Sequence, residues 1–167
     1  MSSYPAPPPP DNHGQYNYGQ NTTAEPPPAI KTSVNIIWAV VALSVVGTIL
    51  TFLFLDDIVE SAGVSLDSSE ADAARIGGMV GSVIGLLIFG ALWVLLGIFL
   101  RKGANWARIT LTVLAVLALV FGVIGLLGEQ PAIFLVLGIL QMALYVALLV
   151  FMWRTESSAY IAARKAG

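Results

Sequence analysis

The stretch GGMVGSVIGLLIFGALWVLLGIFL, residues 77–100, decides the fold of this chain. It holds no charged side chain, and as a helix it would extend about 36 Å, enough to cross the roughly 30 Å hydrocarbon core of a bilayer. Its apolar residues run continuously and do not alternate with polar ones. In lipid, where backbone groups must be satisfied internally, this pattern predicts a helix rather than a barrel strand.

Three further apolar stretches complete a set of four predicted spans, at residues 34–55, 77–100, 107–127 and 131–153. The single charged side chain within these ranges is Arg108, near the start of the third span. Short connections at 101–105 and 128–130 force neighbouring spans to run antiparallel. The sequence predicts an all-α membrane protein, with an antiparallel bundle of four transmembrane helices occupying residues 32–154.

Composition supports this class and excludes several others. Apolar residues make up 57% of the chain, charged residues 11%, and the mean hydropathy is +0.82, whereas soluble domains carry about 25% charged residues. A net charge of −2 without a basic cluster argues against nucleic acid as a partner. The chain has no cysteine, and His13 is its single histidine. We therefore expect no enzyme activity, no metal site and no cofactor.

The segments outside the spans have distinct compositions. Residues 1–31 are rich in proline and are expected to form a disordered cytoplasmic tail, either a spacer or a docking segment, since Pro7 and Pro10 fit the PxxP pattern. Residues 155–167 are expected to form a cytoplasmic C-terminal tail. The long loop at 56–76 begins its second half with Asp67-Ser-Ser-Glu70, which predicts a short helix that continues into the second span. Gly128 and Pro131 are expected to act as helix cap and first-turn residue.

Charge predicts the orientation of the bundle, because lysine and arginine accumulate on the cytoplasmic side of a membrane. Of the eight cations, only Arg75 falls on the side opposite to the rest. The acids of the 56–76 loop fall on that same side. Both termini are therefore expected in the cytoplasm, in a multi-pass protein of the cell membrane.

The glycines of the second span form the most regular pattern in the chain. Gly77, Gly81 and Gly85 repeat at four-residue spacing, with Ser82 on the adjoining row. Small residues at this spacing let another helix backbone approach closely. Packing within the bundle is the leading interpretation, and self-association or a pore lining are the alternatives.

Two other groups of polar residues are candidates for a structural or a binding role. Gln141 lies near the middle of the fourth span, and its amide is expected to bond Ser82, Thr110 or Thr112 on another helix, with substrate contact as the alternative. Asp56 and Glu60 lie four residues apart in the outer loop. We interpret them as solvated surface, with weak cation binding as the alternative.

Aromatic and basic residues mark the predicted span ends. Trp38, Trp106 and Trp153 lie near the basic side, where indole rings anchor helices at the membrane interface. Arg108 and Arg154 are expected to reach the lipid phosphates from the same level.

Short motifs near the span ends carry a resemblance to other membrane proteins. They are Asp72-Ala-Ala, Gly103-Ala-Asn-Trp-Ala-Arg108, and Trp153-Arg154 followed by Ser157-Ser-Ala-Tyr160. From about residue 30 to 161 the chain resembles uncharacterised actinobacterial-type four-span proteins with a proline-rich cytoplasmic tail. The resemblance implies a cell-membrane location, and it implies no activity.

The functional hypothesis follows from these features. The sequence favours a non-enzymatic membrane protein that acts through contacts, as an accessory subunit or scaffold of membrane or envelope machinery. Its partners would be the lipid bilayer, a membrane protein or a second copy of the chain, and a cytoplasmic partner of the tail. The alternative is a small-molecule channel or transporter formed by an oligomer. Against it stands the absence of an ionisable residue deep within the spans.

Overall fold

The computed structural model describes residues 25–128 and 130–166. Most of the predicted proline-rich tail, Pro7 and Pro10 included, lies outside the described residues, as does Glu129. The described chain is helical without strands, in the order α1 (Pro28–Leu53), α2 (Leu55–Ser61), α3 (Ser69–Arg101), α4 (Asn105–Leu126), α5 (Ala132–Met152) and α6 (Thr155–Ala166). Four of these helices, α1, α3, α4 and α5, are long and apolar enough to cross a membrane. The predicted all-α four-span bundle is confirmed.

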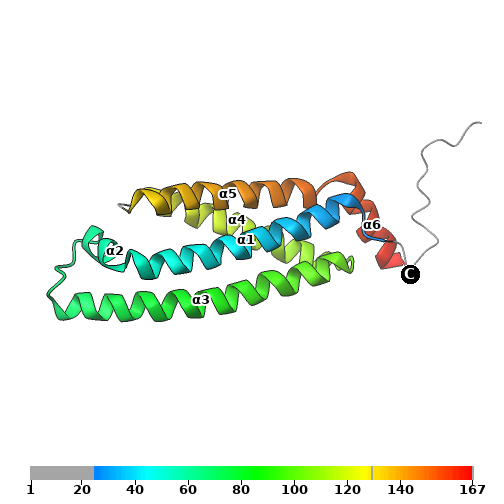
Figure 1. Cartoon of the computed structure of the whole chain (residues 1–167). Helices are drawn as coiled ribbons and strands as arrows, with labels where there is room; N and C mark the ends of the chain where they lie inside the picture. The colour runs from blue at the N-terminus through cyan, green and yellow to red at the C-terminus, as the bar shows by residue number, and fades with distance from the viewer. Residues whose placement is uncertain (1–24, 129, 167) are drawn as a thin grey trace, which may run out of the picture.

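The four long helices form a ring in which each helix packs on two neighbours. Helix α1 contacts α3 and α5, and α4 contacts the same two helices (Figure 1). Helix α3 has 33 residues, so it extends about 50 Å and exceeds the thickness of the hydrocarbon core. The short helices α2 and α6 lie at opposite ends of the bundle (Figure 1).

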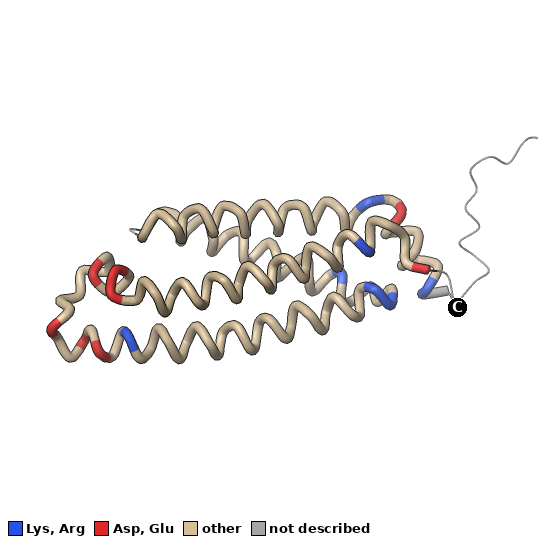
Figure 2. The backbone as a smooth tube through the Cα atoms, in the orientation of Figure 1, with Lys and Arg blue, Asp and Glu red and all other residues tan. Residues whose placement is uncertain are grey.

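Charges separate between these two ends (Figure 2). The end that carries α6, called the basic end below, holds Lys31, Arg101, Lys102, Arg108, Arg154 and Arg164, together with Glu25 and Glu156. The end that carries α2, called the acidic end, holds Asp56, Asp57, Glu60, Asp67, Glu70 and Asp72, together with Arg75. Each long helix thus connects a basic end to an acidic one.

The exceptional cation Arg75 is held by neighbouring acids. Its Nε donates to Asp56 at 2.8 Å, and its Nη1 donates to Asp72 at 3.1 Å and to the Leu66 carbonyl at 3.3 Å. Since Arg75 belongs to α3 and Asp56 to α2, these bonds fix the short helix against the long one. Leu55 and Val59 of α2 are buried, and a Cβ at Gly78 of α3 would lie 3.3 Å from Leu55 Cδ1, so apolar packing supports the same contact.

The termini of the helices differ from the predicted boundaries in several places. Helix α1 begins at Pro28 rather than at residue 34, and Ala29, Ile30 and Ser33 in its first turns are buried. Helix α3 begins after Ser68, whose hydroxyl accepts the Ala71 N–H at 3.2 Å, and it continues into the second span as expected.

The expected left-handed cap at Gly128 is wrong. Positive φ angles among the described residues belong to Gly63, at 76°, and Gly103, at 82°. These two glycines follow α2 and α3, where the chain reverses direction between helices. A glycine tolerates this conformation because it has no Cβ. Gly128 instead donates its N–H to the Gly125 carbonyl at 3.3 Å.

The buried core of the bundle lies in its basic half. Trp93, Leu96 and Leu100 near the end of α3 pack with residues from the first half of α1, the first half of α4 and the end of α5. The fully buried contributors from those helices are Ile30, Ile37, Val40, Ala107, Leu111, Ala115, Leu148 and Met152.

Helix α6, which the sequence analysis assigned to a tail, closes this core at the basic end. Ser157, Tyr160 and Ile161 recur at the spacing of one helix face, and all three are buried. The Tyr160 hydroxyl donates to the Arg101 carbonyl at 3.1 Å, and the Ser157 hydroxyl donates to the Phe151 carbonyl at 3.0 Å. The last helix is therefore part of the folded bundle.

Gly97 is the small residue of α3 that allows close approach of α1. A Cβ built there would lie 3.3 Å from Ile37 Cδ1, whereas a Cβ at Gly81 meets nothing within 4 Å.

We expect Gly97→Leu to lower the melting temperature in detergent and Gly81→Leu not to lower it. Overpacking costs about 1–3 kcal/mol, while both variants share the gain of about 1 kcal/mol from replacing glycine in a helix. Circular dichroism on heating measures both, and equal melting temperatures would contradict this packing.

Candidate functional site

A cleft of about 800 Å³ opens between the long helices in the acidic half of the bundle. It is called the acidic-half cleft below. All four long helices line it, over residues 40–51 of α1, 82–93 of α3, 114–121 of α4 and 134–145 of α5, with Gln130 between the last two. Its volume lies within the range of about 300–1,000 Å³ typical of ligand sites. The side chains of the bundle therefore leave a ligand-sized space between its helices.

The floor of the cleft is aromatic and rigid. Trp93 of α3 stacks on Tyr145 of α5, with ring centroids 5.4 Å apart and an angle of 24° between the ring planes. Trp93 is only 6% exposed and belongs to the buried core. The stacked pair therefore separates the cleft from the packed basic half.

The polar groups of the cleft are mostly satisfied within their own helices. Ser44, Thr48 and Thr51 each donate to the carbonyl four residues earlier, at 2.9–3.0 Å. Ser82 donates to the Met79 carbonyl at 3.0 Å. All four residues line the cleft, and a hydroxyl oxygen that donates one hydrogen bond can still accept another, here from an occupant.

The prediction that Gln141 bonds a residue of another helix is wrong. Its Nε2 donates to the Tyr145 hydroxyl at 3.0 Å, one turn along the same helix. The hydroxyls of the three expected partners each donate to a carbonyl of their own helix instead. These residues are Ser82, Thr110 and Thr112. Residues four apart lie on the same face of a helix, so Gln141 can reach Tyr145 without a partner on another helix.

The glycine row does not pack within the bundle, contrary to the leading interpretation. A Cβ placed at Gly77, Gly81 or Gly85 would meet nothing within 4 Å. Of this row, Gly85 and the adjoining Ser82 line the acidic-half cleft, whereas Gly77 and Gly81 do not. Close helix contacts instead form at glycines outside the row, such as Gly97 against Ile37 and Gly122 against Met142.

The predicted interfacial anchors divide into two groups. Trp38, Trp106 and Arg154 are exposed at the basic end, in accord with rings and charges at the headgroup level. Arg108 is 5% exposed, so the expectation that it reaches lipid phosphates is wrong. Its guanidinium carbon lies 3.9 Å from the ring centroid of Trp153.

Arg108 and Trp153 instead form a contact that joins three helices, called the basic-end lock below. Arg108 Nη2 donates to the Ser158 hydroxyl of α6 at 2.9 Å, while the Trp153 indole N–H donates to the Thr112 hydroxyl of α4 at 3.0 Å. Arg108 Nε is buried without a hydrogen-bond partner. The sequence shows each of these residue types near a span end, but not that they meet.

No group of three or more His, Cys, Asp or Glu side chains within residues 25–128 and 130–166 is placed to hold a metal ion. Asp56, one of the two acids considered for weak cation binding, accepts the Arg75 bond described above.

Comparison with known proteins finds no match to this chain among protein-family models, curated proteins or solved structures.

Trp153 and Trp38 make a matched pair, since they are 54% and 56% exposed at the same end of the bundle. We expect Trp153→Phe to lower the free energy of unfolding by about 0.5–2 kcal/mol, because it removes the N–H bond to Thr112 and weakens the contact with Arg108. Trp38→Phe removes no hydrogen bond within the described chain and should change stability much less. Unfolding in mixed detergent micelles measures both, and an equal loss would contradict the basic-end lock.

Proposed function

We propose that this chain is a non-enzymatic membrane protein that acts through contacts, as an accessory subunit or scaffold of membrane machinery. The contact site is the acidic-half cleft, and its occupant is an apolar transmembrane helix of a partner protein. The tail in residues 1–31 recruits or spaces a cytoplasmic partner. The single observation that carries the proposal is a cleft among packed helices whose lining is rich in small residues.

The composition of the lining supports a helix as the occupant. Glycine, alanine and serine account for seven of its residues, namely Ser44, Gly47, Ser82, Gly85, Gly90, Ala118 and Gly138. Small residues allow the backbones of two helices to approach, which in lipid is a principal source of association energy. Lipid tails fill any such cleft by default, so a partner helix needs only to pack better than they do.

The depth of the cleft also suits a helix. The lining of α1 extends from Val40 to Thr51, which corresponds to about 17 Å or three turns. Gln141 uses one of its N–H groups on Tyr145, and the described residues offer no partner to its carbonyl. A polar side chain of the arriving helix can bond this carbonyl, at a gain of about 0.6–2 kcal/mol.

The rival function, an oligomeric channel or transporter, finds support in the unpacked positions Gly77 and Gly81. The packed core of the basic half, with Leu96, Leu111 and Leu148 at 0–1% exposure, lies between the cleft and the basic end. Solutes would therefore have to cross between copies of the chain rather than through one copy. This difference makes the two functions separable by experiment.

A photoreactive residue in place of Phe89 tests the cleft. Phe89 lines the cleft and is 57% exposed, while Leu87 on the same helix is 66% exposed and does not line it. In native membranes we expect the probe at 89 to form an adduct with one defined membrane protein, and the probe at 87 to form mainly lipid adducts. Mass spectrometry of the cross-linked bands identifies the products.

A second substitution controls for the site. A Cβ meets nothing within 4 Å at either Gly85 or Gly81, but only Gly85 lines the cleft. Gly85→Phe should therefore place its ring in the cleft and abolish the protein adduct, whereas Gly81→Phe should preserve it. Lipid adducts alone at position 89 would refute the partner helix. A dimer of this chain as the product would instead support the oligomeric rival.

The proposed orientation has a direct test, because the chain contains no cysteine. Ser65 near the acidic end and Ala162 on α6 are both exposed and can each be replaced by cysteine. A membrane-impermeant maleimide applied to intact cells should label Ser65→Cys at once and Ala162→Cys only after permeabilisation. Labelling of both without permeabilisation would refute two cytoplasmic termini in a four-span protein of the cell membrane.

A further inference from the structure

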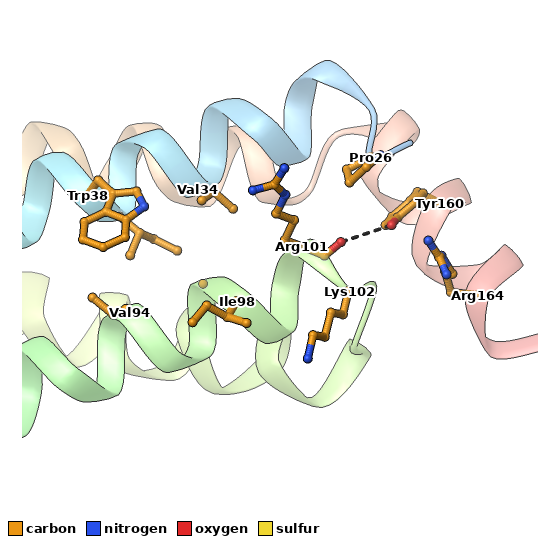
Figure 3. Close-up of a pocket in the computed structure, with 11 residues that line it drawn as sticks. Pro26, Val34, Trp38, Val94, Ile98, Arg101, Lys102, Tyr160 and Arg164 are labelled. Carbon is orange, nitrogen blue, oxygen red and sulfur yellow. Dashed lines mark hydrogen bonds between the residues drawn. The ribbon is translucent and has the colours of Figure 1, made fainter. Parts of the chain in front are cut away.

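A second cavity, of about 470 Å³, lies at the basic end between α1, α3 and α6 (Figure 3). It is called the basic-end pocket below. Its polar wall contains Arg101 and Lys102 from the end of α3 and Arg164 from α6. Its apolar wall contains residues of α1 and α3 that continue toward the middle of the bundle, among them Val34, Trp38 and Ile98. The pocket therefore joins a cationic rim to an apolar groove.

The pocket has three cations and no carboxylate in its lining. Lys102 lies 5.5 Å from the ring centroid of Phe99, and Arg164 lies 5.5 Å from that of Tyr160. No ion pair of Arg101 or Lys102 occurs in the part of the chain that the structure describes. Arg101 and Lys102 thus bring two positive charges without a described ion pair to the rim of one concave site, which favours an anion there.

The acid next to this region is already engaged. Glu25 pairs with Lys31, and the hydrogen bond and charge of Lys31 lower the pKa of the Glu25 carboxyl, with a smaller contribution from the charge of Arg101. This carboxylate does not line the pocket. Arg101 and Lys102, which form no ion pair within the described part of the chain, can therefore meet an external anion.

The local fold builds the rim from two distant parts of the sequence. The Tyr160 hydroxyl bonds the Arg101 carbonyl at 3.1 Å (Figure 3), which fixes α6 beside the end of α3. A Cβ at Gly103 would come within 2.8 Å of Arg164 Cγ. Because Gly103 lacks that atom, Arg164 can lie next to the α3–α4 turn and share the pocket with Arg101.

The position of the pocket decides which anion fits it. Arg101 and Lys102 end the span of α3, and the indole of Trp38 is 56% exposed beside them, the arrangement typical of the headgroup level of a membrane. Ile98, half exposed on the apolar wall, can contact an acyl chain. A free inorganic anion has no apolar part that could contact this wall. A phospholipid has both a phosphate for the cationic rim and an acyl chain for the apolar wall.

We propose that the basic-end pocket binds an anionic phospholipid, with its phosphate among Arg101, Lys102 and Arg164 and an acyl chain along Val34, Trp38 and Ile98. Basic pockets between membrane helices on the cytoplasmic side are suited to such headgroups. The site lies at the opposite end of the bundle from the acidic-half cleft, and its occupancy does not depend on the function proposed for that cleft.

Native mass spectrometry of the full-length chain in detergent tests this site. The chain is titrated with phosphatidylglycerol and, separately, with phosphatidylcholine of the same acyl chains. We expect one phosphatidylglycerol to bind at least tenfold more tightly than phosphatidylcholine. Arg164→Gln should reduce phosphatidylglycerol affinity about five- to tenfold, as one cation near a phosphate contributes about 1 kcal/mol or more.

The controls separate a defined site from general attraction. Arg154→Gln removes an exposed cation from the same end that does not line the pocket, and it should leave the affinity within twofold. Equal losses for Arg154→Gln and Arg164→Gln, or equal binding of the two lipids, would overturn the proposal. Competition by millimolar glycerol phosphate as effective as that by the lipid would assign the site to a soluble phosphate and overturn the lipid. Unchanged circular dichroism verifies that each variant is folded.

Discussion

Close approach of helix backbones, combined with a few polar contacts, is the constraint on which this bundle depends. In lipid, an apolar side chain gains little by exchanging acyl chains for another helix, so hydrophobicity alone does not hold helices together. The chain concentrates the required contacts in its basic half, where Gly97 admits Ile37 and where Arg108, Trp153 and Ser158 connect α4, α5 and α6. Helix α6 then covers the buried end of the core with Tyr160 and Ile161.

The open acidic half follows from the same constraint. Large side chains of the core reach only as far as the stacked Trp93 and Tyr145. Beyond this pair the lining combines small and hydroxylated residues, such as Gly47 and Ser82, with large ones such as Phe89, and it leaves a space that these side chains do not fill. At the far end α2 is held to α3 through Arg75 and Asp56, so the acidic ends of α1 and α3 stay together while the cleft remains between the helices. The bundle is therefore packed in its basic half and open in its acidic half.

The transmembrane spans could be predicted from the sequence, but the side-chain contacts between them could not. Continuous apolar runs such as 77–100 predict helices because lipid leaves the backbone few alternatives. Which side chains meet depends on the rotation of each helix, which no single run specifies. For that reason the Gly77–Gly85 row was assigned to the wrong face, and Gln141 to the wrong partner. Helix α6 was missed because its 12 residues are too short to be stable alone and gain their helix from the core they cover. The spacing of Ser157, Tyr160 and Ile161 was the signal that could have indicated it.

Arg108 illustrates why residue type and depth do not fix a role in such a protein. A charged side chain within a span is costly, and two arrangements can lower that cost: extension to the lipid phosphates, which we predicted for Arg108, or a partner inside the bundle. The structure takes the second way, because α6 brings a hydroxyl and α5 brings an indole face to the guanidinium. Its Nε has no hydrogen-bond partner, so the ring of Trp153 must compensate for lost solvation, as cation–π contacts do best when they are shielded from water. The charge at this position therefore acts as a connector between helices, whereas Arg101 and Lys102 at the same end of the bundle are exposed.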